Sequence, residues 1–390
     1  MKDYQPDRIV YLKNKLLSVP LKMAVSDAKV VMGKQRTLAN VFLTCTEIKT
    51  ENGLEGMGFT YALRAGGYSQ YQLANEFAPL LLGEDPNDIS RLWDKLSWAS
   101  NSLGSSGLAT QTISAFDMAL WDIKGKRASL PLNKLLGSYR ETLPCYNTSG
   151  GYLQVPIEEV VKNAKKSLAQ GIGGIKLKVG QADYKKDVER VRILRQELGD
   201  DVSIMIDANQ QWDLSTALRA GEQLDKYNLT WLEEPLNAHD VQGHYKLTQT
   251  LKTSIGTGEM LSSVAEISEF IECSAVDLIM PDAMRLGGIT PFLDVMSKAA
   301  EKRMMLAPHF VMELHLSLAA TYTLNAWVEH IEWLQPVFNE KIKMKNGEMF
   351  VSAALGNGLS LNEKNTQGML LMEKEFSKKK GINYGDNNEN

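Results

Sequence analysis

The sequence predicts a parallel α/β barrel that follows a smaller α+β domain. From residue 143 onward, short apolar runs alternate with amphipathic stretches about seven times, which is the rhythm of β/α units. Three of these runs end in an acidic residue at equal steps along the chain, as expected for functional groups at the mouth of a barrel. The first 140 residues lack this rhythm, and a chain of 390 residues is long enough for two domains.

The first domain, residues 1–140, contains the pattern of an antiparallel hairpin. Residues 41–50 alternate in polarity like a strand, residues 51–53 form a turn, and residues 56–61 return. Helical patterns follow, the clearest at 112–124, where the apolar residues fall on one face. We therefore expect an α+β domain here.

The second domain, residues 141–345, is expected to hold seven strands separated by helices. The strands are expected near residues 143–148, 173–179, 202–207, 230–233, 254–258, 276–280 and 304–307. The clearest helical stretches are 157–169, 184–198 and 214–227. An open doubly wound sheet is the alternative, but this many units in this length favour a closed barrel. The rhythm stops after residue 345, so residues 346–390 form a third segment.

Charge and composition exclude several classes of function. The net charge of −4 gives no surface for nucleic acid or an anionic membrane. No run approaches the length of a membrane span, and the first residues lack the apolar stretch of a signal peptide. Cys45, Cys145 and Cys273 have neither metal-binding nor redox spacing. We therefore expect a cytoplasmic protein that acts on a small molecule.

Three acidic residues are the strongest indication of function. Asp207, Glu233 and Glu259 each close a short apolar run and stand 26 residues apart. Successive parallel strands would bring the three carboxylates together at one end of the barrel. Three oxygen donors without a Cys or His favour a hard divalent cation, Mg²⁺ before Zn²⁺.

Two lysines precede the first of these acids. Lys176 and Lys178 lie two positions apart in a predicted strand, so their side chains share one face. We predict that both point into the barrel, because the carboxylates would balance their charge; the alternative is that both point outward. Mutual repulsion is predicted to lower the pKa of one lysine toward the range of a general base.

A histidine and an aspartate complete the pattern. His309 and Asp282 each follow a predicted strand, one β/α unit apart, so Asp282 would accept a hydrogen bond from His309, fix its tautomer and raise its pKa. Asn209 is predicted to bond a ligating carboxylate or a substrate hydroxyl, although an ordinary loop position fits it equally well. Glu234 is predicted to face outward. The other four histidines are predicted to be structural or to lie at the surface.

Together these motifs resemble those of the enolase superfamily, mandelate racemase subgroup. They are Lys-x-Lys at 176 and 178, Asp-x-Asn at 207 and 209, Glu233-Glu-Pro235, Gly258-Glu259, Pro281-Asp282 with Gly287-Gly-Ile289, and Pro308-His309. The resemblance covers nearly the whole chain. It implies an α/β fold, a (β/α)7β modified TIM barrel whose α+β N-terminal capping domain is completed by the C-terminal segment.

The resemblance also implies the roles of the central residues. The three acids at 207, 233 and 259 are implied as the ligands of one Mg²⁺ per subunit. Lys178 is implied as the base on one face of the substrate. His309, paired with Asp282, is implied as the base or acid on the other face. Lys176 is implied as the electrostatic partner of the enolate, in contact with the substrate. Glu329, with Glu332 nearby, is implied as the acid that hydrogen-bonds the substrate carboxylate.

Within the subgroup, the runs 145–150, 207–213 and 306–310 look most like those of the dehydratases that act on L-talarate and galactarate. So do Asp27-Ala-Lys29 and Arg64-Ala-Gly66. This implies that Asp27, Lys29 and Arg64 lie over the barrel mouth, where Lys29 and Arg64 would bind the distal carboxylate and hydroxyls. Leu63 departs from that group, which tends to be basic there. A homo-oligomer is also implied by resemblance.

The implied reaction is Mg²⁺-dependent dehydration of an acid sugar, a hexarate such as galactarate or L-talarate, to a 2-keto-3-deoxy acid. Abstraction of the α-proton would give an enediolate, from which the β-hydroxyl is eliminated. The alternatives within this class are a racemase or epimerase of a 2-hydroxy acid and a dehydratase of another mono- or diacid sugar. A Schiff-base aldolase with Lys178 as nucleophile and a non-catalytic sugar-acid-binding protein are alternatives from other classes.

Overall fold

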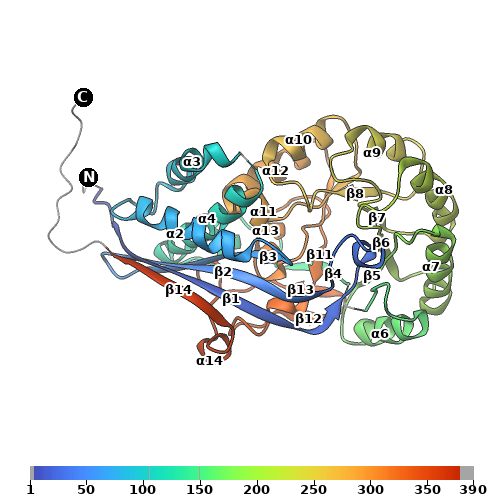
Figure 1. Ribbon diagram of the computed structural model, residues 1–390, viewed down its shortest axis with the longest axis horizontal. Coiled ribbons are helices and arrows are strands. Elements are labelled where there is room, and N and C mark those ends of the chain that lie inside the picture. The colour runs from blue at the N-terminus through green and yellow to red at the C-terminus, as the bar shows by residue number, and fades with distance from the viewer. Residues whose placement is uncertain (1–3, 105, 149, 378–390) are drawn as a thin grey trace.

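The computed structural model of the protein describes residues 4–104, 106–148 and 150–377. Two units are visible in Figure 1: a curved sheet with helices on one side, and a barrel ringed by helices. No helix in the described ranges is long and apolar enough to cross a membrane.

The first unit, which we call the cap, is a four-stranded antiparallel sheet covered by helices. Its strand order is β14-β1-β2-β3. The bounds are β1 Ile9–Val25, β2 Leu38–Thr50, β3 Glu55–Leu63, β14 Leu370–Ser377, α1 Ala28–Val31, α2 Gly67–Leu81, α3 Ile89–Ala99, the 3-10 turn η1 Asn101–Leu103, and α4 Leu108–Ala128. The predicted hairpin is β2 with β3, and the predicted helix 112–124 is the middle of α4. Apolar residues of β1, α2, α3 and α4 close one core under the sheet.

Strand β1 is the main element that the sequence pattern does not indicate. It runs for 17 residues and pairs with β2 on one edge and β14 on the other. Polar side chains interrupt its alternation: Lys13 pairs with Glu373 of β14 at 3.0 Å, and Lys15 pairs with Glu47 of β2 at 2.8 Å. These cross-strand partners make the charges acceptable in a central strand.

The second unit is a closed barrel of eight parallel strands. In chain order the elements are α5 Leu132–Leu135, β4 Thr142–Asn147, α6 Ile157–Ala169, β5 Gly174–Lys178, α7 Tyr184–Leu198, β6 Ser203–Asp207, α8 Leu214–Leu224, η2 Asp225–Tyr227, β7 Trp231–Glu233, α9 Val241–Thr248, β8 Ile255–Thr257, α10 Val264–Glu272, β9 Leu278–Ile279, α11 Ala283–Leu286, α12 Ile289–Glu301, β10 Met305–Leu306, α13 Met312–Ala319, β11 Val328–His330 and η3 Glu332–Leu334. All seven predicted strands are present.

The barrel closes through its eighth strand. Neighbouring strands pair in parallel from β4 to β10, and β11 pairs with β4. A bridge between Leu306 and Ala326 joins β10 to the segment that leads into β11. This arrangement is the predicted (β/α)7β barrel, and it rules out the open doubly wound sheet.

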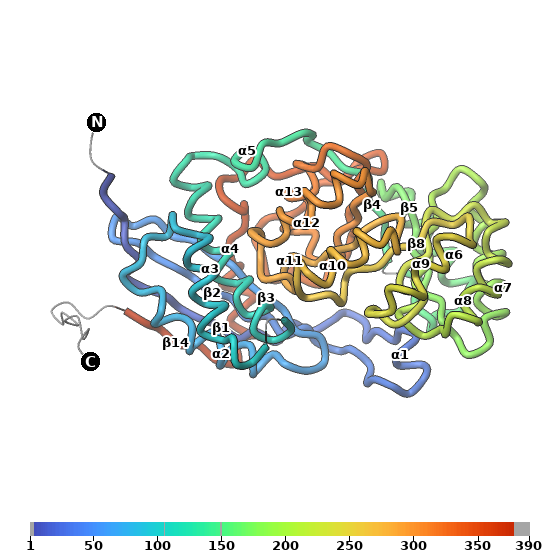
Figure 2. The backbone as a smooth tube through the Cα atoms, turned by 90° about the horizontal axis from the view of Figure 1, so that it is seen from above, coloured from blue at the N-terminus to red at the C-terminus, as the bar shows by residue number. Residues whose placement is uncertain are grey.

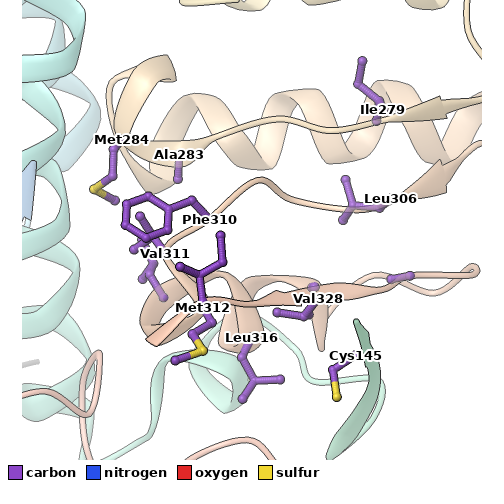
Figure 3. Packing of buried hydrophobic residues seen from close by; sticks show 14 of the residues in the cluster. Cys145, Ile279, Ala283, Met284, Leu306, Phe310, Val311, Met312, Leu316 and Val328 are labelled. Carbon is purple, nitrogen blue, oxygen red and sulfur yellow. The ribbon is translucent and has the colours of Figure 1, made fainter. Parts of the chain in front are cut away.

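Two apolar clusters fill this unit. Inside the barrel, large side chains from several strands pack below the mouth, including Tyr146, Met205 and Trp231. Outside the strands, a larger cluster joins them to the helices. Figure 3 shows part of it, where Phe310 lies beside Ala283 and Met284 and where Leu306 and Val328 lie on separate strands.

The C-terminal segment returns from the barrel to the cap. Strands β12 Lys343–Lys345 and β13 Glu348–Phe350 form a hairpin, and β13 pairs antiparallel with β4. After α14 Glu363–Thr366, β14 adds to the edge of β1 (Figure 1), and Figure 2 shows the red strand β14 on the same side of the molecule as the blue N-terminal strands. The cap is therefore completed by the C-terminal segment, as predicted, whereas the boundaries at 140 and 345 stay predictions.

Helix α4 holds three other segments through two buried carboxylates: Asp117 binds the barrel, and Asp122 binds β3 and the C-terminal segment. Asp117 accepts hydrogen bonds from the backbone N–H of Thr290 at 3.0 Å and from its hydroxyl at 2.5 Å, so it holds the first turn of α12. Gly288, with a φ of 113°, allows this approach, since a Cβ there would lie 2.3 Å from the Asp117 carboxylate. Asp122 accepts from the backbone N–H groups of Met57 and Asn357, both at 2.9 Å.

Candidate active site at the barrel mouth

The three predicted metal-ligating acids lie together at the carboxyl ends of β6, β7 and β8. Asp207 and Glu233 are the last residues of β6 and β7 and are partners in the parallel register, and Glu259 comes two residues after β8. One carboxylate oxygen from each of the three acids lies within 4.8 Å of the others, and all three residues are buried. The equal spacing in the sequence therefore predicted a real convergence in space.

The donor set fits a divalent cation. Burial and the neighbouring carboxylates together raise the pKa of Glu233 well above its ordinary value, against the opposing effect of Lys176. The Oε1 atom of Glu233 is buried and has no hydrogen-bond partner among the described residues. Such an oxygen is costly unless something binds it. A hard cation among three carboxylates would satisfy this oxygen and favour the ionised acid.

Lys176 points into the barrel and is enclosed by acids. Its Nζ lies 2.8 Å from Glu233, 2.6 Å from Glu329 and 3.9 Å from Asp207, and the side chain is 1% exposed. Burial disfavours its charge, but Glu233 and Glu329 outweigh burial and raise the pKa of Lys176 well above its ordinary value. Lys176 is therefore a fixed positive charge at the base of the site.

Lys178 also points inward, and its Nζ forms an ion pair with Asp207. This confirms the predicted direction of both lysines, but the prediction that repulsion lowers the pKa of one of them is wrong. Burial and the charge of Lys176 do lower the pKa of Lys178, but the carboxylates, Asp207 first, reverse this and raise the pKa above its ordinary value. The nearest charge to Lys178 is an acid rather than the other lysine, because Asp207 is its partner in the register of β5 and β6.

His309 and Asp282 form the predicted pair. The Nδ1 atom of His309 lies 2.9 Å from Oδ2 of Asp282, and Nε2 lies 3.4 Å from Glu259. Asp282 is fully buried; burial raises its pKa, but His309 more than offsets this, and the pKa of Asp282 lies below its ordinary value. The imidazole therefore has one nitrogen bound by a carboxylate and the other turned toward the acid cluster.

Lys178 and His309 reach the acid cluster from different sides. Lys178 ends β5, and His309 follows β10; in the closed barrel β4 and β11 separate these strands in one direction and β6 to β9 in the other. Lys178 meets the cluster at Asp207, whereas His309 meets it at Glu259. The site thus has an amine and an imidazole on separate sides of the carboxylates.

Asn209 and Glu234, which follow Asp207 and Glu233, both lie in the buried part of the site. Asn209 donates from its backbone N–H to Asp207 at 2.8 Å and from its side chain at 3.2 Å, so it holds a carboxylate of the cluster. Glu234 is buried rather than outward-facing, which corrects that prediction. Its backbone has a φ of 41°, which breaks the strand alternation and turns the side chain to Gln210. Burial first, then nearby acids, raise the pKa of Glu234 to about 8.

Glu329, on β11, is the last-strand acid of the site, whereas Glu332 is exposed. It accepts hydrogen bonds from Lys176 and from the Thr148 hydroxyl, each at 2.6 Å, and from the backbone N–H of Phe310 at 2.8 Å. Burial raises its pKa, but Lys176 and then His309 bring the pKa of Glu329 down to about 2. In this ionised form it only accepts, so a hydrogen bond to a substrate carboxylate would require its protonation.

A cavity of about 810 Å³ opens above the cluster, between the barrel and the cap. The predicted site residues that line it are Asp27, Lys29, Arg64, Lys176, Lys178, Asn209, Glu259, His309 and Glu329. Arg64 pairs with Asp27 at 3.1 Å, and the other Asp27 oxygen accepts from the N–H of Val30 to begin α1. Leu63 also lines the cavity.

Four further residues of the cavity were not singled out from the sequence: Tyr61, Thr148, Tyr152 and Arg285. Arg285 follows Asp282 by three residues, a helical spacing that could have indicated it. Tyr61 lies in the predicted hairpin, but no local pattern connects it to the barrel.

Two family models match the chain with this architecture. One is the mandelate racemase / muconate lactonizing enzyme N-terminal domain, over residues 11–137. The other, described as enolase C-terminal domain-like, covers residues 159–365 and hence most of the barrel. The chain belongs to the mandelate racemase / muconate lactonizing enzyme family. The resemblance to the enolase superfamily is thereby confirmed.

Relatives within this family are similar over nearly their whole length. An L-talarate/galactarate dehydratase of Salmonella typhimurium is 51% identical over 92% of this chain and 90% of its own. Its crystal structure with Mg and L-lyxarohydroxamate has a TM-score of 0.95 at 49% identity and covers 97% of this chain and 96% of that one. An L-talarate dehydratase from Polaromonas sp. JS666, complexed with Mg and L-glucarate, has a TM-score of 0.93 at 50% identity, with coverage of 95% and 100%.

Proposed function

We propose that the protein is a hydro-lyase that dehydrates an acid sugar, with galactarate and L-talarate as substrates and Mg²⁺ as cofactor. One observation carries the proposal: Lys178 and His309 meet the same cluster of three carboxylates from separate sides. That arrangement suits removal of a proton next to a carboxylate, followed by loss of a hydroxyl. The 51% identical relative, which is named for these two diacids, supports the choice of substrate.

The proposed Mg²⁺ would bind at the cluster of three carboxylates. A Mg²⁺ ion held by Asp207, Glu233 and Glu259 would supply positive charge for the developing enediolate and would offset the acids that keep Lys178 an ammonium. Lys176 adds a second, permanent positive charge close by, because Glu233 and Glu329 hold it in place.

The proton transfers follow from the two sides of the site. Lys178 or His309 removes the α-proton, depending on the configuration at C2, and the C–H electron pair moves into the carboxylate as an enediolate. When these electrons return, the C3–O bond breaks and the hydroxyl leaves as water with a proton from His309. The resulting enol takes up a proton at C3, loses the proton of its C2 hydroxyl and becomes the 2-keto-3-deoxy acid. Return of a proton to the opposite face of C2 would instead epimerise the substrate.

The cap is proposed to bind the far end of the diacid. Lys29 and Arg64 line the cavity above the carboxylate cluster and carry the charge that a distal carboxylate needs. Asp27 holds Arg64 and begins the helix that carries Lys29, so its proposed contribution is to place both cations. We further propose that the protein works as a cytoplasmic homo-oligomer with one Mg²⁺ per subunit.

The proposal is tested by incubating the protein with a panel of mono- and diacid sugars and Mg²⁺ and measuring 2-keto-3-deoxy acid. We expect product from galactarate and L-talarate, and none after EDTA treatment. Configurational change without keto acid would instead indicate a racemase or epimerase. Covalent trapping of Lys178 by borohydride in the presence of substrate would indicate the aldolase. A protein that binds the diacids without a single turnover would be a binding protein.

The two bases are tested by Lys178→Ala and His309→Asn. Each is expected to lower the dehydration rate by roughly 10²- to 10⁴-fold, the contribution of a general acid or base, without changing bound Mg²⁺. Matched controls are Lys162→Ala and His239→Asn, which replace exposed residues of the same types and should leave the rate unchanged. Full turnover by either site variant would contradict the assigned roles.

A further inference from the structure

Tyr61 reaches from the cap into the barrel and touches the residue that holds His309. It lies on β3, is 4% exposed, and its hydroxyl donates to Oδ2 of Asp282 at 2.5 Å. The same Oδ2 atom is the partner of His309 Nδ1 at 2.9 Å, and the Tyr61 oxygen lies 3.5 Å from that nitrogen. A hydroxyl from one unit and an imidazole from the other thus share one carboxylate oxygen.

The Asp282 carboxylate has little freedom to rotate once it binds both the Tyr61 hydroxyl and the His309 imidazole. Its other oxygen, Oδ1, accepts from the backbone N–H of Met284 at 2.8 Å and so begins α11. A carboxylate oxygen can accept two hydrogen bonds, so Oδ2 can hold the phenol and the imidazole at once. Rotation of the carboxylate would break all three bonds, which fixes the plane of the imidazole and directs Nε2 toward the cavity and Glu259.

Tyr61 is itself held on several sides. Its ring packs edge-on against Phe310, with centroids 4.9 Å apart, and its carbonyl accepts from the side chain of Gln70 on α2 at 3.1 Å. Arg285 donates to the Tyr61 oxygen at 3.3 Å. Figure 3 shows Phe310 next to Ala283 and Met284, the residues that directly follow Asp282. Tyr61, Phe310 and the start of α11 therefore form one packed unit around the Asp282 carboxylate.

The chemical form of Tyr61 suits this contact. Burial raises the pKa of the phenol well above its ordinary value, with a smaller opposing effect of Arg285. The hydroxyl is therefore a neutral donor, which the ionised Asp282 requires.

We infer that Tyr61 is a positioning residue of the capping domain, which acts through Asp282 on the imidazole of His309. Proton transfer on that face of the substrate therefore depends on how the cap is placed on the barrel. This inference rests on the proposed function, in which His309 delivers the proton to the leaving hydroxyl. Tyr61 does not itself exchange a proton with the substrate. The capping domain would then do more than bind the distal end of the diacid.

The test is Tyr61→Phe, which keeps the ring and removes the hydroxyl. We expect kcat for dehydration to fall roughly 10- to 100-fold, as when a hydrogen-bond partner behind a functional His is lost, with KM unchanged within about twofold. Exchange of the α-proton with solvent deuterium should persist at the wild-type rate for the diacid whose α-proton faces Lys178, because that exchange does not need His309.

A second measurement does not depend on activity. In protein with ¹⁵N-labelled histidine, the His309 signals are identified by their absence in His309→Asn, and we expect the Nδ1 shift of His309 to move in Tyr61→Phe. The matched control is Tyr322→Phe, which removes a buried hydroxyl that donates to the Met304 carbonyl at 2.6 Å, away from the site. It should leave both the rate and the His309 shift unchanged.

Three results would overturn the inference: wild-type turnover by Tyr61→Phe, an equal loss of dehydration and of α-proton exchange, or an unchanged Nδ1 shift of His309. The second of these would indicate that the variant has only loosened the cap. If Tyr61→Phe fails to fold by thermal melting, Gln70→Leu, which releases the Tyr61 carbonyl, takes its place; the same three results in that variant would overturn the inference. If the wild-type protein forms no keto acid, the proposed function fails while the ¹⁵N measurement still decides the contact between Tyr61 and the pair of Asp282 and His309.

Discussion

Two regions of the molecule that bury carboxylates, the barrel mouth and helix α4, differ in what surrounds those carboxylates. Along α4, Asp117 and Asp122 accept hydrogen bonds from backbone N–H groups of other segments, and each stands apart from other acids. At the mouth, Asp207, Glu233 and Glu259 crowd together, and one oxygen of Glu233 has no partner in the described part of the chain. Burial of an acid therefore does not mark a functional site; crowding with an unsatisfied oxygen does.

The largest effect is expected from the α4 acids. Asp122→Ala would leave the N–H groups of Met57 and Asn357 without their acceptor. It would also remove the carboxylate that lies 2.7 Å from the Lys126 ammonium. We expect the free energy of unfolding to fall by about 2–6 kcal/mol, because each buried N–H group that loses its acceptor costs about 1–3 kcal/mol. Urea unfolding measures this. Mg²⁺ affinity of the molecules that remain folded should not change, and a change would erase the distinction between the two regions.

A smaller effect is expected from Glu233→Gln, which should lower the dehydration rate without lowering the stability. The amide keeps the shape but removes one charge from the crowded cluster, so the protein without metal should be at least as stable as the wild type. Dehydration should fall roughly 10²- to 10³-fold, the usual loss when one electrostatic group of an active site is removed. Urea unfolding without Mg²⁺ measures the stability, and formation of keto acid from galactarate measures the dehydration rate. A strongly destabilised variant would place Glu233 with the structural acids.

The smallest effect, counted per pH unit, is a dependence of the free energy of unfolding on pH that Asp117 causes. Burial, partly offset by hydrogen bonds to Thr290, raises its pKa from 3.8 to about 7. Between these values the folded chain keeps a proton that the unfolded chain has lost, so this residue's contribution to stability falls as pH rises. Asp117→Asn removes that dependence, so its stability relative to the wild type should rise by at most about 1.4 kcal/mol per pH unit from pH 4 to 7. Urea unfolding at several pH values measures the free energy of unfolding of both proteins. A difference between the variant and the wild type that does not change with pH would contradict this.

The sequence predicted which residues meet at the barrel mouth because a β/α unit repeats. Equal steps between Asp207, Glu233 and Glu259 translate into neighbouring strand ends, and the same rule placed His309 beside Asp282. Helices α6 and α7 have the predicted bounds, since their amphipathic pattern is strong. Local periodicity was sufficient for all of these.

What the sequence did not predict depends on contacts between distant segments. The charges of β1 have partners on β2 and β14, which no local pattern indicates. Tyr61 meets Asp282 across 221 positions of chain. The burial of Glu234 follows from a single left-handed residue that reverses the expected alternation. The pKa of Lys178 depends on which charge lies nearest, and only the register of β5 against β6 determines that.

Strand β14 has a consequence for how the molecule is assembled during translation. Strands β1 to β3 leave the ribosome early, but the outer edge of β1 pairs with β14, which is synthesised about 300 residues later. Until then, the edge backbone groups of β1 have no strand partner, a condition that invites pairing with other chains. The nascent cap must therefore wait for the barrel to be made, so a fragment ending at the barrel would keep one edge open.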